Sequence, residues 1–351
     1  MHENRHERPG VYSAYDASAV ISAGRGGKTV GVAAKALRGT VGQVVTLTGY
    51  AAGVAAFGED TAPGMSTLLR LLFSNGAATV KAVRVADESP DYAGAFEALG
   101  KVEAQILVCD SPDQSVQQDL RTAVETASGQ RRERIAVVGG SELTAAQLVE
   151  RAAALNSERM VLVGPDLLDG KGGTLPGVFA AAAVAGVIAA GTDPAIPLNG
   201  ARLSGLAGLT EDYGDNDIDL LVRGGVTPLE SVAGEISPVR GITTRTTTGG
   251  AADATWRELT TILIVDDLIP AIRAALRSRF SRAKNTARGR SAIRSQVIVE
   301  LEKKVRAEII DSYGEVTVTA MEEDPTVCLV EFSFAVAHGL NQIYLTVHIT
   351  V

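Results

Sequence analysis

The chain has 351 residues, with 41 acidic and 33 basic side chains and a formal net charge of −8. Hydrophobic residues make up 46% and charged residues 21%, which is ordinary for a folded protein and excludes a chain that is disordered throughout. The acidic balance, together with only 7 Phe, 7 Tyr and 1 Trp, argues against a nucleic-acid binder that relies on base stacking.

Cysteine and histidine usage excludes several kinds of site. The two cysteines, Cys109 and Cys328, are too few for a disulfide scaffold or a Cys-rich metal site, and they indicate synthesis in a reducing cytoplasm. The four histidines lie near the ends of the chain, at His2, His6, His338 and His348. A catalytic Ser-His-Asp or Cys-His set in the central part is therefore excluded, and we expect no metal and no cofactor. The charged start of the chain also predicts that there is no signal peptide.

The first quarter of the chain is Gly-rich and strand-like. Residues 1–25 are predicted to form an extended amino-terminal arm. Residues 26–95 are predicted to form a small β-rich domain. Its expected elements are strands at 29–34, 43–48 and 77–86 and a helix at 65–73.

Residues 96–240 show a different period and predict an α/β domain. Short apolar strands at 105–109, 135–138 and 160–163 alternate with helices at 113–127 and 144–155. An Ala-rich stretch at 178–190 is too short to span a membrane and is interpreted as a buried helix. This alternation is typical of βαβ units around a parallel sheet.

Residues 241–337 predict an α+β domain, and residues 338–351 a carboxyl-terminal strand arm. The expected elements are a strand at 259–265, helices at 268–280 and 291–313, and strands at 316–320 and 327–337. The predicted fold class is thus a multidomain α+β and α/β protein with extended strands at both ends.

One segment imitates a phosphate-binding loop. Gly26-Gly27-Lys28-Thr29 resembles the end of a P-loop, and Asp266 closes an apolar run as a magnesium-binding acid would. A P-loop-like NTPase that uses Lys28 and Asp266 is therefore the alternative function. The pattern is incomplete because Ser22 stands where the first glycine is needed and the following residues look like a strand. A hairpin turn at 24–27 and a helix cap at Asp266-Asp267 are the simpler interpretations.

Positive charge is concentrated between residues 273 and 306. This segment contains eleven basic residues and only two acidic ones, Glu300 and Glu302, so its net charge is +9. Such a segment favours an acidic protein partner, although a solvated helix face or a nucleic-acid contact would give the same composition.

The last nine residues alternate strictly between apolar and polar side chains. Burying the five apolar ones is worth roughly 1.5 to 3 kcal/mol each, while ordering nine backbone residues costs about 1 to 2 kcal/mol each. The balance is near zero, so this strand must pair with a sheet, either of its own chain or of a neighbour. Residues 8–12 also form an extended start that cannot fold alone, and two strand-like ends favour β-augmentation between subunits.

Several segments in order resemble one known family. They are Arg8-Pro9-Gly10-Val11-Tyr12, Pro197-Leu198-Asn199-Gly200, Gly225-Val226-Thr227-Pro228, residues 240–247, residues 256–261 and the segment from Asp324 to the end. Together they are similar to the tail sheath proteins of contractile phages and of phage-like R-type bacteriocin particles such as diffocin.

The resemblance implies a structural protein without enzymatic activity and with a non-catalytic, subtilisin-like middle domain. Such subunits polymerise as a helical sleeve around an inner tail tube, and the sleeve contracts to drive the tube through a cell envelope. The implied partners are other copies of the chain, the tube protein, and baseplate and tail terminator proteins, with no nucleic acid and no membrane bound by the subunit. The particle would be assembled in the bacterial host cytoplasm and then released.

The resemblance also assigns roles to two sets of residues. Arm strands that pair with neighbouring subunits would include Val11, Tyr12, Tyr15, Ile343, Leu345, Val347, Ile349 and Val351. The acceptor strands would lie at 316–320 and 327–337. From charge alone, a tube-facing basic patch would comprise Arg273, Arg277, Arg279, Arg282, Lys284, Arg288, Arg290 and Arg294.

Overall fold

The computed structural model describes residues 27–341. The predicted arm strands at Val11–Tyr15 and Ile343–Val351 lie outside the described residues. The elements of the fold lie between these two predicted strands.

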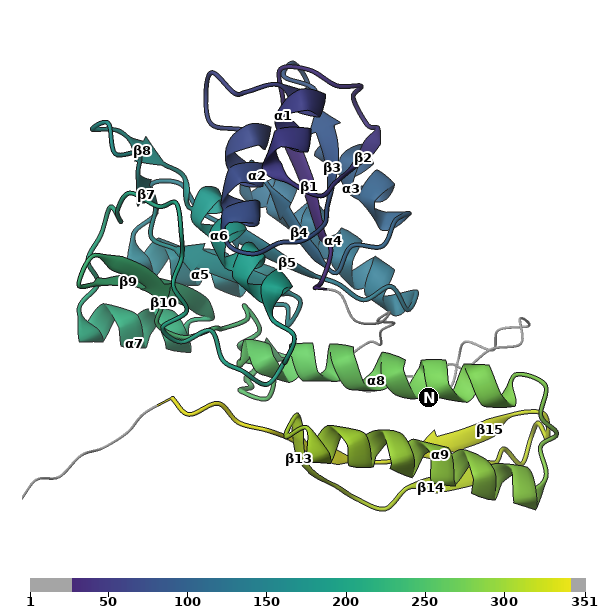
Figure 1. Cartoon of the computed structure of the whole chain (residues 1–351). Coiled ribbons are helices and arrows are strands. Elements are labelled where there is room, and N and C mark those ends of the chain that lie inside the picture. The colour runs from purple at the N-terminus through teal and green to yellow at the C-terminus, as the bar shows by residue number, and fades with distance from the viewer. Residues whose placement is uncertain (1–26, 342–351) are drawn as a thin grey trace, which may run out of the picture.

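The body of the molecule is built on an eight-stranded sheet in the order β10-β9-β6-β5-β4-β1-β3-β2 (Figure 1). The strands are β1 (Val30–Lys35), β2 (Val44–Leu47), β3 (Val80–Val85), β4 (Ile106–Cys109), β5 (Ile135–Gly139), β6 (Met160–Gly164), β9 (Val226–Val232) and β10 (Glu235–Pro238). The central pairs are parallel, and β2 and β10 are antiparallel edge strands. Every residue of β4, β5 and β6 is buried, as expected for parallel strands covered on both faces.

The predicted boundary near residue 95 is wrong. Strand β1 lies between β3 and β4, so the segments 26–95 and 96–240 share one sheet rather than forming two domains. Both edges of β1 are occupied by these parallel neighbours. The reason is that parallel pairing joins strands far apart in the sequence, and no local pattern reports it. The hairpin turn predicted at residues 24–27 lies, except for Gly27, outside the described residues.

Helices cover both faces of this sheet. Helices α1 (Tyr50–Phe57), α2 (Met65–Ser74) and α6 (Gly177–Ala190) contribute to one buried cluster, and α3 (Tyr92–Gly100), α4 (Gln114–Gly129), α5 (Ala145–Leu155) and α7 (Asp215–Arg223) to the other. The Ala-rich helix α6 is buried along nearly its whole length, which confirms that prediction. Short hairpins, β7 (Leu167–Leu168) with β8 (Thr174–Leu175) and β11 (Thr247–Thr248) with β12 (Ala251–Ala252), extend from loops.

The carboxyl-terminal part begins with one long helix, α8 (Leu259–Phe280). The predicted strand at 259–265 is therefore wrong, and Asp266-Asp267 do not cap a helix but lie inside one. Pro270 also lies in the helix interior. The run of β-branched residues favours a strand locally, but this segment is buried against two neighbouring clusters, and tertiary packing overrides the propensity.

A second helix and two β ribbons complete this part. Helix α9 (Ala287–Arg306) packs on α8, and it ends before β13 (Ile310–Tyr313), so the predicted helix at 291–313 is too long. The predicted strand at 327–337 is two strands, β15 (Cys328–Glu331) and β16 (Phe334–Val336). Strand β14 (Thr317–Ala320) pairs with β15, and β13 pairs with β16.

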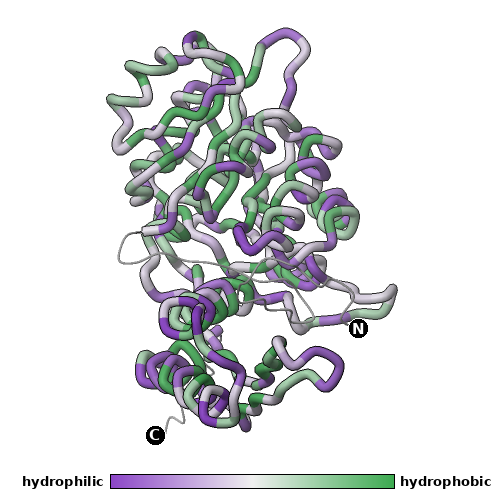
Figure 2. The backbone as a smooth tube through the Cα atoms, turned by 90° about the vertical axis from the view of Figure 1, so that its right-hand side faces the viewer, coloured by the Kyte–Doolittle hydropathy of each residue, from purple (hydrophilic) through white to green (hydrophobic). Residues whose placement is uncertain are grey.

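Figure 2 views the molecule from the side, with the large α/β body above the smaller carboxyl-terminal part. Helix α8 belongs to both. Leu259 and Ile262 join the core of the body, whereas Ile264, Leu268 and Ile272 join the carboxyl-terminal core. Among residues 27–341, no helix is both long and apolar enough to cross a membrane.

Candidate functional site at the joint between the body and helix α8

The amino ends of the parallel strands meet at one edge of the sheet, and helix α8 lies along that edge (Figure 1). Glu133 lies two residues before β5, and Arg159 directly precedes β6. These charged side chains face Asp266 and Arg273 of α8. Two ion pairs therefore lie at the joint between the α/β body and the carboxyl-terminal part.

Arg159 and Asp266 form a two-pronged ion pair. The Arg159 Nη1 atom lies 3.0 Å from Asp266 Oδ2, and Nη2 lies 3.2 Å from Oδ1. The Arg159 side chain is fully buried. Burial raises the pKa of the Asp266 carboxyl, and the Arg159 guanidinium opposes that rise. Such a pair fixes orientation well because the planar fork of arginine matches a carboxylate.

Glu133 and Arg273 form a second buried pair, with Nη2 of the arginine 3.5 Å from Oε1 of the glutamate. The other carboxylate oxygen of Glu133, Oε2, is buried and has no hydrogen-bond partner among the described residues. Burial raises the pKa of Glu133 to about 7, with Asp266 adding to the rise while Arg273 and Arg159 oppose it. The negative charge of the Glu133 carboxylate is thus only partly balanced by its neighbours, because only one of its two oxygens has a partner.

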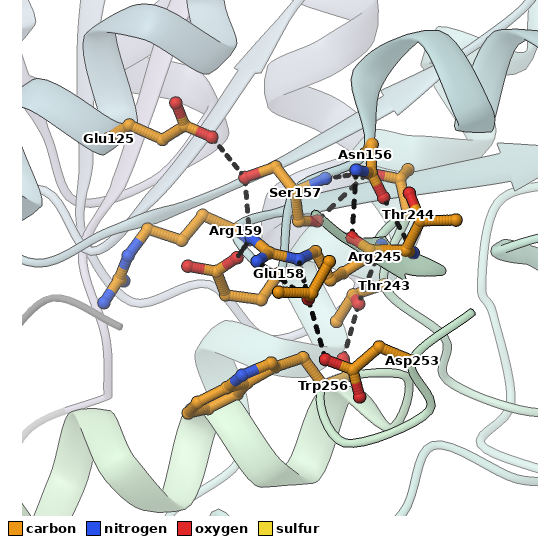
Figure 3. A network of polar contacts seen from close by, with 12 residues as sticks. Glu125, Asn156, Ser157, Glu158, Arg159, Thr243, Thr244, Arg245, Asp253 and Trp256 are labelled. Carbon is orange, nitrogen blue, oxygen red and sulfur yellow. Dashed lines mark hydrogen bonds and ion pairs between the residues drawn. The ribbon is translucent and has the colours of Figure 1, made fainter. Parts of the chain in front are cut away.

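The segment that leads into α8 is fastened to the body by a polar network (Figure 3). Thr244 Oγ1 donates to the Ser157 carbonyl at 3.0 Å and accepts from the Ser157 amide at 3.0 Å. Arg245 lies 2.9 Å from Glu158, and Asn156 Oδ1 accepts from the amides of Thr246 and Thr247. Residues 243–247 are therefore held to the loop before β6 by side chains as well as by backbone.

The structure gives Lys28 and Asp266 roles other than nucleotide binding. Residues after Thr29 form β1 rather than a helix whose amino end could receive a phosphate. Lys28 Nζ donates to the Gly191 carbonyl at 3.0 Å, and Asp266 is engaged by Arg159. Both lie at the amino ends of the strands, whereas open α/β sheets bind ligands at the carboxyl ends.

The carboxyl edge of the sheet carries an internal hydrogen-bonded pair at the point where the strand order reverses, between β1 and β4. Asp110 accepts from the Tyr92 hydroxyl at 2.6 Å and from the Lys35 amide at 2.9 Å. Burial raises the pKa of Asp110. Both carboxylate oxygens thus serve structure at this position. Over residues 27–341, no group of three or more acidic, Cys or His side chains could hold a metal ion.

The predicted basic patch is divided by the structure. Arg273 is buried at the joint, so its assignment to an exposed patch is wrong. Arg290 and Arg294 are partly engaged, by Asn285 and by the Val316 carbonyl, and Arg279 pairs with Gln296. The rest of the set lies around the turn between α8 and α9. The side chains of Arg277, Arg282, Lys284 and Arg288 are exposed there and have no hydrogen bond or ion pair with any described residue.

The predicted acceptor strands form two separate ribbons. Strands β14 and β15 pair with each other, and most of their residues are half-buried. Strands β13 and β16 form the other ribbon. Two-stranded ribbons are marginal by themselves. The outer edges of both ribbons can accept further strands. The edge strand β10 of the body differs, because the backbone amides of Gly200 and Leu203 donate hydrogen bonds to its carbonyl groups.

The sequence alone did not identify Glu133 and Arg159 as joint residues. A signal was present for Arg159, because it stands immediately before a fully apolar strand, where the chain enters the core and a charged side chain needs a partner. The sequence does not identify that partner, since Asp266 lies 107 residues from Arg159 and was assigned to a helix cap.

Comparison of the sequence with known protein families gives two matches. The sequence pattern of the phage tail sheath protein central domain matches residues 86–244, and that of the phage tail sheath C-terminal domain matches residues 251–350. The chain belongs to the phage tail sheath family. It is 29% identical over 261 residues to the tail sheath protein of Bacillus phage SP01, which covers 72% of this chain and 44% of that relative. The chain therefore spans less than half the length of this curated relative.

Solved sheath structures share the fold. The crystal structure of the sheath tail protein from Desulfitobacterium hafniense has a TM-score of 0.71 at 12% identity, covering 93% of this chain and all of that one. The helical sheath of the anti-feeding prophage in its contracted state has a TM-score of 0.72 at 17% identity, over 98% of this chain and 99% of that one. The contracted sheath complex of an extracellular contractile injection system, PVC, has a TM-score of 0.73 at 16% identity, over 99% of both chains. At these identities the likeness concerns the sheath fold.

Proposed function

We propose that this sheath-family chain is a structural subunit that polymerises into a helical sleeve around an inner tail tube. Contraction of the sleeve would drive the tube through the envelope of a target cell. The supporting observation is the pair of two-stranded ribbons in the carboxyl-terminal part, whose outer edges pair with no other strand of residues 27–341, together with a chain end of strict strand alternation. Similar solved chains are the helical sheath of the anti-feeding prophage and the PVC sheath complex, both in the contracted state.

In this proposal the arms complete the ribbons of neighbouring subunits. The donor residues are Val11, Tyr12, Tyr15, Ile343, Leu345, Val347, Ile349 and Val351. Strand addition satisfies backbone groups on both partners at once, so it links subunits even where few side chains touch. The subtilisin-like description of the middle domain stays a prediction, and we assign that domain a structural rather than a catalytic role.

Deletion of residues 344–351 tests the arm role. The truncated chain should stay folded, because the body has its own core, but it should form no tubes in negative-stain electron microscopy. A matched control replaces Thr346 and Thr350 by serine, which keeps the alternation. Normal tubes from the truncated chain would contradict the proposal.

The exposed basic residues at the α8–α9 turn are proposed to contact an acidic tube exterior. Arg277, Arg282, Lys284 and Arg288 are unpaired within the described chain, and such charge favours association with an acidic surface. Reversing Arg282 and Lys284 to glutamate should weaken co-sedimentation with tubes, while reversing the exposed Arg202 on the body should not. Unchanged tube binding would contradict this assignment.

The other proposed partners are a baseplate protein and a tail terminator protein. Assembly would occur in the bacterial cytoplasm before release of the particle.

A further inference from the structure

The two described ends of the chain are both held by one short loop. The loop is Gly191–Asn199, which follows helix α6, and we call it the arm-root loop. Its first residue binds the root of the amino-terminal arm, and its last residues contact the root of the carboxyl-terminal arm.

At the amino-terminal root, Lys28 is attached to the end of α6 twice. Its amide donates to the Ala189 carbonyl at 3.0 Å, and its Nζ atom donates to the Gly191 carbonyl at 3.0 Å. Burial lowers the pKa of the Lys28 ammonium, and the nearby carboxylates of Asp267, Asp266 and Asp193 act in the opposite direction. A lysine at the carboxyl end of a helix is favoured by the free carbonyls and the helix dipole.

At the carboxyl-terminal root, the contacts come from the other end of the same loop. Asn199 Nδ2 donates to Asn341 Oδ1 at 2.8 Å. Gly339 lies against Pro197 so closely that an added Cβ atom would be 2.9 Å from the proline ring. The carboxyl-terminal root thus contacts the loop in two ways, through the Asn199–Asn341 hydrogen bond and through the close packing of Gly339 on Pro197.

The loop between these contacts is short and stiff. Eight peptide steps separate Gly191 from Asn199, so their Cα atoms are at most about 29 Å apart. Pro194 and Pro197 have φ fixed by their rings, which limits how far the loop can stretch or recoil. Asp193 Oδ1 accepts from the Ala195 amide at 2.8 Å, and Leu198 is buried in the core of the body. The loop is thus braced by two prolines, an internal hydrogen bond and a buried leucine, and both of its ends are bonded to an arm root.

We propose that the arm-root loop couples the two arm roots mechanically, with Lys28 and Asn199 as its positioning residues. Displacement of one root then displaces the other within the same subunit. The biological use of this coupling rests on the proposed function, in which the arms link neighbouring copies. The coupling itself is a property of the single subunit.

Hydrogen exchange on the unassembled full-length chain tests the coupling. Lys28→Met should raise exchange not only at the Gly191 amide but also at the Gly200 amide, by about fivefold, and Asn199→Ala should raise exchange at the Lys28 amide by a similar factor, because coupling is reciprocal. Lys81→Met and Asn285→Ala are matched controls, since they remove a lysine and an asparagine bond outside the loop. If each substitution affects only its own end of the loop, the proposal is overturned.

Assembly supplies a second readout. Inserting two glycines between Pro194 and Ala195 should leave polymers forming, because both arms are intact, but single sheaths should then contain both extended and contracted segments in electron micrographs. The same insertion between Gly172 and Gly173, in the β7–β8 turn, is the control. Uniform sheaths from the lengthened loop would overturn the proposal. Failure of the unmodified chain to form tubes would instead count against the proposed function, and the exchange experiment would still decide the coupling.

Discussion

The body and the carboxyl-terminal ribbons differ in how completely they are covered. In the body, all residues of β4, β5 and β6 are buried, and the edge strand β10 is protected by loop 200–203. In the ribbons, most residues of β14 and β15 are only half-buried. The centre of the body and its β10 edge are thus covered within one chain, while the outer edges of the ribbons pair with no further strand among the described residues. Substitutions in each region, and at the joint that connects them, can test this difference.

The largest effect is expected for Arg159→Met at the joint. The substitution leaves the Asp266 carboxylate buried without its partner, which should lower the free energy of unfolding by about 3 to 5 kcal/mol in urea titrations. Arg223→Met, in the exposed pair with Asp219, is the control and should cost under about 1 kcal/mol. The double variant Arg159→Met/Asp266→Leu should recover most of the loss. A cost below about 1 kcal/mol for Arg159→Met would show that the pair does not secure the joint.

A matched leucine pair separates the two regions directly. Leu162→Ala in β6 should cost about 2 to 5 kcal/mol, because the side chain is fully buried and leaves a cavity. Leu329→Ala in β15 should cost about 1 kcal/mol or less in the isolated subunit, because that side chain is only partly buried. It should, however, raise the protein concentration needed for tube formation. Equal costs in the isolated subunit would mean that the ribbons are complete without a partner.

Glu133 should make stability depend on pH. Its pKa rises from 4.5 to about 7 in the folded protein, so the folded state favours the protonated form. The stabilisation is fully present below pH 4.5 and is lost as the pH rises through 7. Over this range we expect the free energy of unfolding to decrease by about 3 kcal/mol. Glu133→Gln should flatten the profile between pH 5 and 8. Asp253→Asn is the control, since the pKa of Asp253 is lowered to about 2 and its titration lies outside that window. An unchanged profile in Glu133→Gln would refute the assignment.

The smallest effect on stability is expected at the α8–α9 turn. Reversal of Arg282 and Lys284 should change the melting temperature very little, because exposed and unpaired charges contribute within about 0.5 kcal/mol. Differential scanning calorimetry measures this. A large loss would show that these residues stabilise the subunit itself, and reduced tube binding could then no longer be attributed to a lost contact.

The sequence predicted local elements of the body well. The apolar runs of strands β4, β5 and β6 predict strands because short apolar runs between polar helices have few alternatives, and the predicted helix at 144–155 matches α5 closely. Helices α1 and α3 were not predicted, since their Ala- and Gly-rich segments lack a clear helical period.

Non-local features could not be predicted. The insertion of β1 between β3 and β4 depends on pairing of Val30 with Ile106, far along the chain, and the single helix α8 depends on burial by two separate cores. Arg159 and Asp266 at the joint follow the same rule: each residue is ordinary in its own segment, and only the fold brings the two together. The exposed basic turn was predictable from charge, but the burial of Arg273 was not.

Helix α8 has a consequence for the way a sleeve of such subunits could shorten. It has 22 residues and is about 33 Å long, and its side chains are embedded in both cores. A tilt of the α/β body against the carboxyl-terminal part would disrupt the packing of one core or the other. Each subunit should therefore move as a rigid body. Any shortening of the polymer must then come from subunits that slide and rotate at the interfaces between them.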